Sequence, residues 1–135
     1  LADFINKMGG EVQGAGTSSI KINGVQSLSE VSHRPIGDRI EAATFVMTGL
    51  LTQSNIKVID FSTDHISSIL DSLEEMGAKL KIEENSVEVF PSRLVAKNIT
   101  TMPYPGFPTD AQAQMMTLLA NLGLLQIQLL ILFLY

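Results

Sequence analysis

LEEMGAKL at residues 73–80 repeats the pattern of INKMGGEV at residues 5–12, with an offset of 68 positions. In both segments, apolar residues at helical spacing end at a glycine, which readily takes the left-handed conformation that closes a helix. A strand-like segment follows each helix, and SIKI at residues 19–22 matches SVEV at residues 86–89 with an offset of 67. A repeat of this length indicates a helix–hairpin unit that the chain uses more than once.

A second helix is expected after each copy of this unit. The first begins at Asp38, and its packing positions are Ile40, Ala43, Val46, Met47, Leu50 and Leu51. The other begins at Asp110, and its packing positions are Ala113, Met116, Thr117 and Ala120. Each aspartate occupies the position of an N-cap, where a carboxylate accepts hydrogen bonds from free backbone N–H groups.

The segment between the two repeats predicts one more strand and the start of a helix. Residues 56–61 (IKVIDF) have strand character, and residues 62–64 (STD) are typical of a helix cap. Strands and helices therefore alternate, without the long apolar strands of a doubly wound sheet. The predicted fold class is α/β or α+β, with sheets covered by helices and the repeat as the organising unit.

The composition limits the class of protein. The chain has 135 residues and no cysteine, so it can form a core but neither disulfides nor thiolate metal sites. Its net charge is −5 and its nine basic residues are scattered, whereas a nucleic-acid groove needs clustered Lys and Arg; we expect no nucleic-acid partner. The chain opens on a helical pattern without Met or a signal peptide, so we expect it to begin inside a longer protein.

Two segments carry residues suited to chemistry, and the first is HRPIGDRIE at residues 33–41. Arg39 falls in the first turn of the expected helix, where the helix dipole is unfavourable for a cation, so an anionic neighbour is expected there. That anion can belong to a ligand. The alternative is an exposed arginine paired with Glu41 or a nearby loop, worth less than about 1 kcal/mol.

The second segment is MPYPGFPTDAQAQ at residues 102–114. Its prolines hold the chain in a stiff path that ends at the start of a helix. A rigid loop that delivers one carboxylate, Asp110, is suited to positioning a catalytic base. The alternative is an ordinary N-cap aspartate after a proline-rich connection.

Other polar residues do not form a chemical motif. His33 and His65 are isolated, and neither has metal-ligand spacing to another His, Asp or Glu, so both are expected to be surface or cap residues. GAGT at residues 14–17 opens no helix and is interpreted as a hairpin connection rather than a phosphate loop. We therefore expect no metal site.

Taken together, these segments resemble the UDP-N-acetylglucosamine enolpyruvyl transferase (1-carboxyvinyltransferase) family from residue 1 to about residue 119. The most specific match is PGFPTDAQAQ at residues 105–114, supported by residues 14–17, residues 38–41 and Phe45. The resemblance implies a cytoplasmic transferase of bacterial peptidoglycan synthesis, and thus of cell-wall formation, cell shape and division. Such an enzyme moves the enolpyruvyl group of phosphoenolpyruvate to the 3-hydroxyl of UDP-N-acetylglucosamine and releases phosphate. It also implies inside-out α/β repeat units, of which this chain holds an incomplete set.

The resemblance also implies roles for three residues. Asp110 matches the carboxylate that contacts the sugar 3-hydroxyl and is proposed to remove its proton. Thr109 matches the neighbouring residue near the nucleotide sugar, and Arg39 falls where the family's chain crosses between domains and could meet a substrate anion. No cofactor and no metal are implied. The family's acid that protonates phosphoenolpyruvate and its cationic clamp match nothing here, so the chain alone is expected to bind weakly and catalyse little.

The same comparison divides the chain into residues 1–34, the end of one domain, residues 35–121, the start of a second domain, and residues 122–135, an apolar tail without a counterpart. A shifted reading frame or a truncated gene would produce such a tail, and a buried helix or a membrane span are the alternatives. Glutamines at positions 126 and 128 interrupt the tail, so we do not expect a span.

Two other functions stay open from the sequence. The chain could be a non-catalytic truncated product that its apolar tail holds at a membrane or a partner. It could also be related to 5-enolpyruvylshikimate-3-phosphate synthase, which shares the repeat and phosphoenolpyruvate but not the string at residues 105–114.

Overall fold

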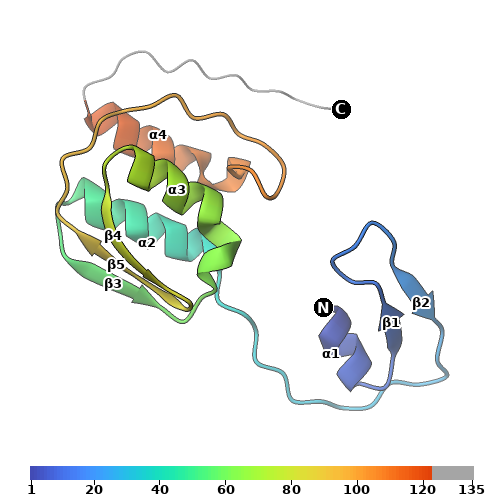
Figure 1. Cartoon of the computed structure of the whole chain (residues 1–135). Helices are drawn as coiled ribbons and strands as arrows, with labels where there is room; N and C mark the ends of the chain where they lie inside the picture. Colours follow the sequence, from blue (N-terminus) through green and yellow to red (C-terminus); the bar gives the residue numbers. More distant parts are fainter. Residues whose placement is uncertain (123–135) are drawn as a thin grey trace. The chain divides into compact units, whose positions relative to one another are not determined.

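The computed structural model describes residues 1–122, which fall into two compact units, residues 1–35 and the part from residue 36 onward (Figure 1). The sequence predicts a domain boundary between residues 34 and 35. Each unit is described by itself below. The predicted tail lies outside the described residues, apart from Leu122.

The first unit is a short helix and a two-stranded hairpin, α1 (Ala2–Lys7), β1 (Glu11–Gln13) and β2 (Lys21–Asn23). The two strands pair antiparallel, with Val12 opposite Ile22. Gly9 ends the helix with φ +93°, as predicted, because only glycine takes this conformation at little cost. None of residues 1–35 is buried, and Ile22 is 70% exposed.

The second unit is a three-stranded antiparallel sheet with helices on one face. Its elements are α2 (Arg39–Leu51), β3 (Ile56–Ile59), the 3-10 helix η1 (Thr63–Ile66), α3 (Ser67–Glu75), β4 (Lys79–Glu83), β5 (Ser86–Phe90), the 3-10 helix η2 (Thr109–Ala111) and α4 (Gln112–Asn121). The strand order is β3-β5-β4, with β5 in the centre. Helix α2 packs against β3 and β5 and also against α4 (Figure 1). The core therefore lies around α2.

The core is built from the apolar positions of these elements. Its buried members include Ala43, Val46, Met47, Leu50, Phe61, Ile66, Ile69, Leu70, Leu73, Met76, Val87, Val89, Phe107, Ala111, Met115 and Leu118. Leu51, predicted to pack, is partly buried against this cluster. The opposite face of the sheet carries charged side chains and is exposed, as the alternation along β4 indicates.

The second copy of the repeat forms the helix–hairpin unit that the sequence predicts, α3, β4 and β5. Gly77 ends α3 with φ +97°, as Gly9 ends α1. The copies differ in burial, because Val89 of β5 is fully buried whereas its counterpart Ile22 is exposed. In the second unit α2 supplies the cover over the strand.

Four local predictions need correction. The strand at 56–61 ends at Ile59, because Asp60 takes φ +66° and leaves the extended conformation. The hairpin strand at 19–22 is shifted to 21–23. Helix α4 buries Met115 and Leu118, and η2 before it buries Ala111, whereas the predicted positions 113, 117 and 120 are exposed. The preceding 3-10 turn changes the register of the packing face.

The fourth correction concerns the start of α4. Asp110 is not an N-cap: it lies inside η2, whose N-cap is Pro108, and neither η2 nor α4 has a side-chain capping hydrogen bond. Its carboxylate points to another helix instead, as described below. Among residues 1–122, no helix is both long and apolar enough to cross a membrane.

Candidate functional site

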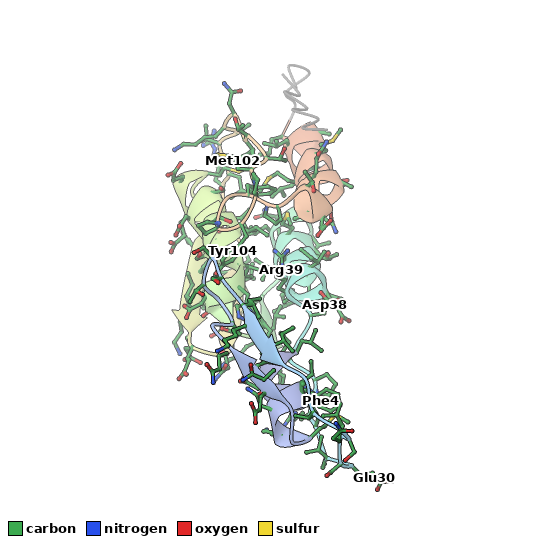
Figure 2. The ribbon with its side chains drawn as sticks, turned by 90° about the vertical axis from the view of Figure 1, so that its right-hand side faces the viewer. Phe4, Glu30, Asp38, Arg39, Met102 and Tyr104 are labelled. Atoms are coloured by element: carbon green, nitrogen blue, oxygen red, sulfur yellow. The ribbon has the colours of Figure 1, made fainter. Side chains whose placement is uncertain are left out.

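The start of α2 is fixed by its N-cap. Oδ1 of Asp38 accepts hydrogen bonds from the backbone N–H groups of Ile40 (2.8 Å) and Glu41 (3.1 Å), as the sequence predicts. This cap sets Arg39 as the first residue of the helix. Figure 2 shows Asp38 and Arg39 at this end of α2.

The proline-rich segment is a closed turn held against the second unit. The N–H of Gly106 donates to the carbonyl of Pro103 (2.8 Å), and that of Met102 donates to the carbonyl of Phe107 (2.9 Å). Phe107 is 5% exposed, and the Ser68 hydroxyl of α3 donates to the carbonyl of Gly106 (3.1 Å). The turn is thus anchored just before Thr109 and Asp110, while Met102 and Tyr104, labelled in Figure 2, are exposed.

Asp110 faces α2. Its Oδ2 lies 3.8 Å from Nη2 of Arg39, and the side chains are 67% and 34% exposed, respectively. The anionic neighbour expected beside Arg39 is therefore this carboxylate rather than Glu41. The accessible carboxylate can accept a proton from a hydroxyl, and the guanidinium beside it can bind an anionic ligand.

A second polar contact joins α2 and α4 one turn beyond this pair. Nε2 of Gln114 donates to the Thr44 hydroxyl (2.9 Å), which itself donates to the carbonyl of Ile40 (2.8 Å). No sequence motif points to a role for Thr44 or for Gln114 by itself. The only available signal was that Gln114 follows Asp110 by four residues inside the specific string, which places both on one side of a helix.

The remaining candidates are dispersed. Thr109 is exposed beside Asp110, and its carbonyl accepts the hydrogen bond that ends η2. His33 lies in the first unit with its ring 4.9 Å from that of Phe4, and His65 lies in η1. Among residues 1–122, no group of three or more His, Asp or Glu side chains could hold a metal ion.

A shallow cavity of about 330 Å³ lies next to the candidate site, between the first turns of α2 and the end of β3. Asp38, Phe45 and Asp60 are among its lining residues, whereas Arg39 and Asp110 are not. The cavity and the Arg39–Asp110 pair therefore both lie at the N-terminal end of α2, but the charged pair does not line the cavity.

Comparison with known proteins assigns this arrangement to a family. Residues 1–126 match the family described as EPSP synthase (3-phosphoshikimate 1-carboxyvinyltransferase). UDP-N-acetylglucosamine 1-carboxyvinyltransferase 1 from Staphylococcus aureus strains N315 and MW2 is 48% identical over 120 residues, which is 88% of this chain. The chain spans 28% of the length of these relatives. It belongs to the EPSP synthase family, and within that family it is similar to UDP-N-acetylglucosamine 1-carboxyvinyltransferases.

Proposed function

We propose that this chain is a segment of an enzyme that transfers the enolpyruvyl group of phosphoenolpyruvate to the 3-hydroxyl of UDP-N-acetylglucosamine. The names of its relatives, at 48% identity, support the reaction and the sugar nucleotide. Because the chain spans 28% of their length, the remainder of the enzyme is its necessary partner. The proposed place of action is the cytoplasm, in peptidoglycan synthesis.

The observation that carries the proposal is the position of the Asp110 carboxylate. It is 67% exposed, it caps no helix, and it stands at the end of an anchored turn within 3.8 Å of a guanidinium. An alcohol is a poor nucleophile, and a carboxylate within hydrogen-bond reach of it contributes roughly 10² to 10⁴ in rate. Asp110 is therefore the proposed general base.

The proposed reaction exchanges one carbon–oxygen bond for another. The hydroxyl proton passes to Asp110 as the sugar 3-oxygen bonds to C2 of phosphoenolpyruvate and an acid from the remainder of the enzyme protonates C3. Loss of that C3 proton with cleavage of the C2–O bond then releases phosphate and restores the carbon–carbon double bond, and Asp110 returns its proton to the solvent. Thr109 is proposed to lie next to the nucleotide sugar. Arg39 is proposed to orient the carboxylate and to meet an anionic group of the bound substrates, because it is the cation beside Asp110.

The two units fit this proposal as parts of different domains. Residues 1–34 would end one domain and residues 35–121 would begin the next, each completed by the rest of the enzyme. The acid that protonates phosphoenolpyruvate and most of the cations for two polyanionic substrates would also come from there. Little turnover is accordingly expected from the chain alone.

The test uses an enzyme in which this chain replaces the matching 120-residue segment of the Staphylococcus aureus relative. Phosphate release with both substrates is compared for the parent, Asp110→Asn and a matched control, Asp64→Asn, at an exposed aspartate of η1. We expect Asp110→Asn to lower kcat by at least about 10²-fold and Asp64→Asn to leave it unchanged. Equal turnover in the parent and Asp110→Asn would refute the assigned role.

The same enzyme identifies the acceptor. The family description names 3-phosphoshikimate, whereas the relatives are named for UDP-N-acetylglucosamine. Each acceptor is offered separately with phosphoenolpyruvate. Phosphate release with the sugar nucleotide alone is the expected result, and release with 3-phosphoshikimate alone would move the proposal to the other reaction.

A further inference from the structure

We infer that Gln114 and Thr44 are positioning residues that hold the Asp110 carboxylate at the place where it meets the acceptor hydroxyl. This inference rests on the proposed function, because it assigns these two residues a task in the reaction of Asp110. It concerns a contact between α4 and α2, which pack against each other.

The hydrogen bond between Gln114 and Thr44 is placed so that it can fix the position of Asp110. Gln114 follows Asp110 by four residues, about one helical turn, and reaches across to Thr44 of α2 at 2.9 Å. Arg39 lies on the same α2, near its start, and faces Asp110. Two contacts thus join this end of α2 to α4 and the turn before it, the Arg39–Asp110 pair and the Gln114–Thr44 hydrogen bond. The hydrogen bond sets the distance between the start of α4 and the start of α2.

Of the two contacts between α2 and α4, the Gln114–Thr44 hydrogen bond restrains the helix positions more than the Arg39–Asp110 pair does. The Arg39–Asp110 pair is 3.8 Å long, with Asp110 67% exposed and Arg39 34% exposed, and long pairs of this kind that reach the surface contribute roughly 0–1 kcal/mol and tolerate several side-chain conformations. The Gln114–Thr44 bond is shorter and half-buried. The Thr44 hydroxyl proton is used on the Ile40 carbonyl, so its oxygen is directed to accept from Gln114.

Gln114 holds this position at a cost. Its Oε1 is buried and has no hydrogen-bond partner among residues 1–122, and an unpaired buried acceptor costs roughly 1–3 kcal/mol. Methionine has a similar shape and removes both the hydrogen bond and the unpaired oxygen. A purely structural role for Gln114 therefore predicts that Gln114→Met is neutral or stabilising, whereas a positioning role predicts a loss of turnover.

The experiment uses the completed enzyme described above. The variants are Gln114→Met, Thr44→Val, which removes the hydroxyl and keeps the shape, and Thr44→Ser, which keeps the hydroxyl. Matched controls are Thr48→Val on α2 and Thr117→Val on α4. Their exposed hydroxyls donate to backbone carbonyls of their own helices, those of Thr44 (2.7 Å) and Ala113 (2.9 Å). The readouts are kcat, KM for each substrate and thermal stability.

We expect Gln114→Met and Thr44→Val to lower kcat by about tenfold or more, because a misplacement of about 1 Å at a reacting group can cost 10²-fold. Neither KM nor Tm should change beyond the controls, the double variant should be no worse than either single one, and Thr44→Ser should restore turnover. If kcat of both single variants stays within about twofold of the controls, or falls only together with Tm, the inference is wrong.

A crystal structure of the completed Gln114→Met enzyme separates this outcome from failure of the proposed function. If Asp110→Asn keeps full turnover, the proposed function fails. In that case the catalytic task of Gln114 and Thr44 fails with it, and the distance tests only whether their bond sets the position of Asp110: the Arg39–Asp110 distance should change from 3.8 Å in Gln114→Met and stay the same in Thr117→Val.

Discussion

Nη2 of Arg39, in the first turn of α2, lies 3.8 Å from Oδ2 of Asp110 in the turn that precedes α4. Each residue was a candidate from the sequence for a separate reason, one for a cation at an unfavourable helix end and the other for a carboxylate after a rigid turn. The fold brings both to one place. Removing either charge should therefore affect the same function.

Removing the Arg39 charge should affect activity more than stability. We expect Arg39→Gln to lower kcat/KM of the completed enzyme by about tenfold, which corresponds to about 1.4 kcal/mol, because the cation beside Asp110 is lost. The free energy of unfolding should change by less than about 1 kcal/mol, because the pair is long, at 3.8 Å, and the Asp110 side chain is 67% exposed. Steady-state phosphate release and urea unfolding measure the two effects.

The control for this variant is Lys97→Gln, which breaks another exposed pair, Lys97–Glu75 at 3.0 Å. Its activity should equal that of the parent. An equal loss of activity in both variants would mean that Arg39 has no special place in the site.

The cap of α2 should be worth about 1 kcal/mol. Asp38→Ala leaves the N–H groups of Ile40 and Glu41 without their acceptor, and loss of such a cap costs roughly 0.5–2 kcal/mol. Asp38→Asn keeps a capping oxygen and should recover most of the loss. Chemical denaturation followed by circular dichroism tests this, and identical curves for the alanine and asparagine variants would contradict it.

Substitution of Phe107, which anchors the proline-rich turn, should lower the stability of the second unit strongly. Phe107 is 5% exposed, and Phe107→Ala should lower the free energy of unfolding by about 3–5 kcal/mol. Tyr104 lies in the same turn but is 72% exposed, so Tyr104→Ala should change stability by less than about 0.5 kcal/mol. A similar cost for both substitutions in urea unfolding would show that the turn is not anchored by Phe107.

Glu83, on the exposed face of the sheet, should make the free energy of unfolding depend on pH in the acid range. Lys81 is the main hydrogen-bond partner that, with Lys57 and Ser86, lowers the pKa of Glu83 from 4.5 to about 2. Because the folded pKa is below the unfolded one, the ionised Glu83 stabilises the fold above about pH 4.5. This stabilisation is lost as the pH falls from 4.5 toward 2.

The measurement is the free energy of unfolding of the parent and Glu83→Gln between pH 2 and 7. The difference between the two should be largest near neutral pH and should shrink in this acid window. A difference that stays constant down to pH 2 would contradict the role of Glu83.

The helices and hairpins could be predicted because their signals are local. Apolar spacing places α2 and α3, Gly77 ends α3, and Asp38 caps α2. The same local rule was wrong for Asp110, because an N-cap signal contains no information about a guanidinium on another helix. That partner is a property of the tertiary structure.

The packing face of α4 and the Thr44–Gln114 bond were missed for related reasons. A 3-10 turn at the start of α4 moves Met115 rather than residue 113 or 117 into the core, and no pattern in the sequence shows that turn. The Thr44–Gln114 bond joins residues of two helices and depends on how the helices pack. The family roles of Thr109 and Asp110 stay predictions until activity is measured.

The lack of any buried residue in the first 35 positions has a consequence for hydrogen exchange. Amides of the β1–β2 hairpin are protected by the ladder between the two strands and by the Asn6 side chain, which accepts from the N–H of Val12, and no buried layer covers them, so they should exchange by local opening within the dead time of a manual experiment. Amides of β5 lie in the centre of the sheet under α2 and should exchange only when the second unit unfolds as a whole. Two copies of one repeat would thus differ in protection by orders of magnitude within a single polypeptide, because α2 covers the strands of only the second copy.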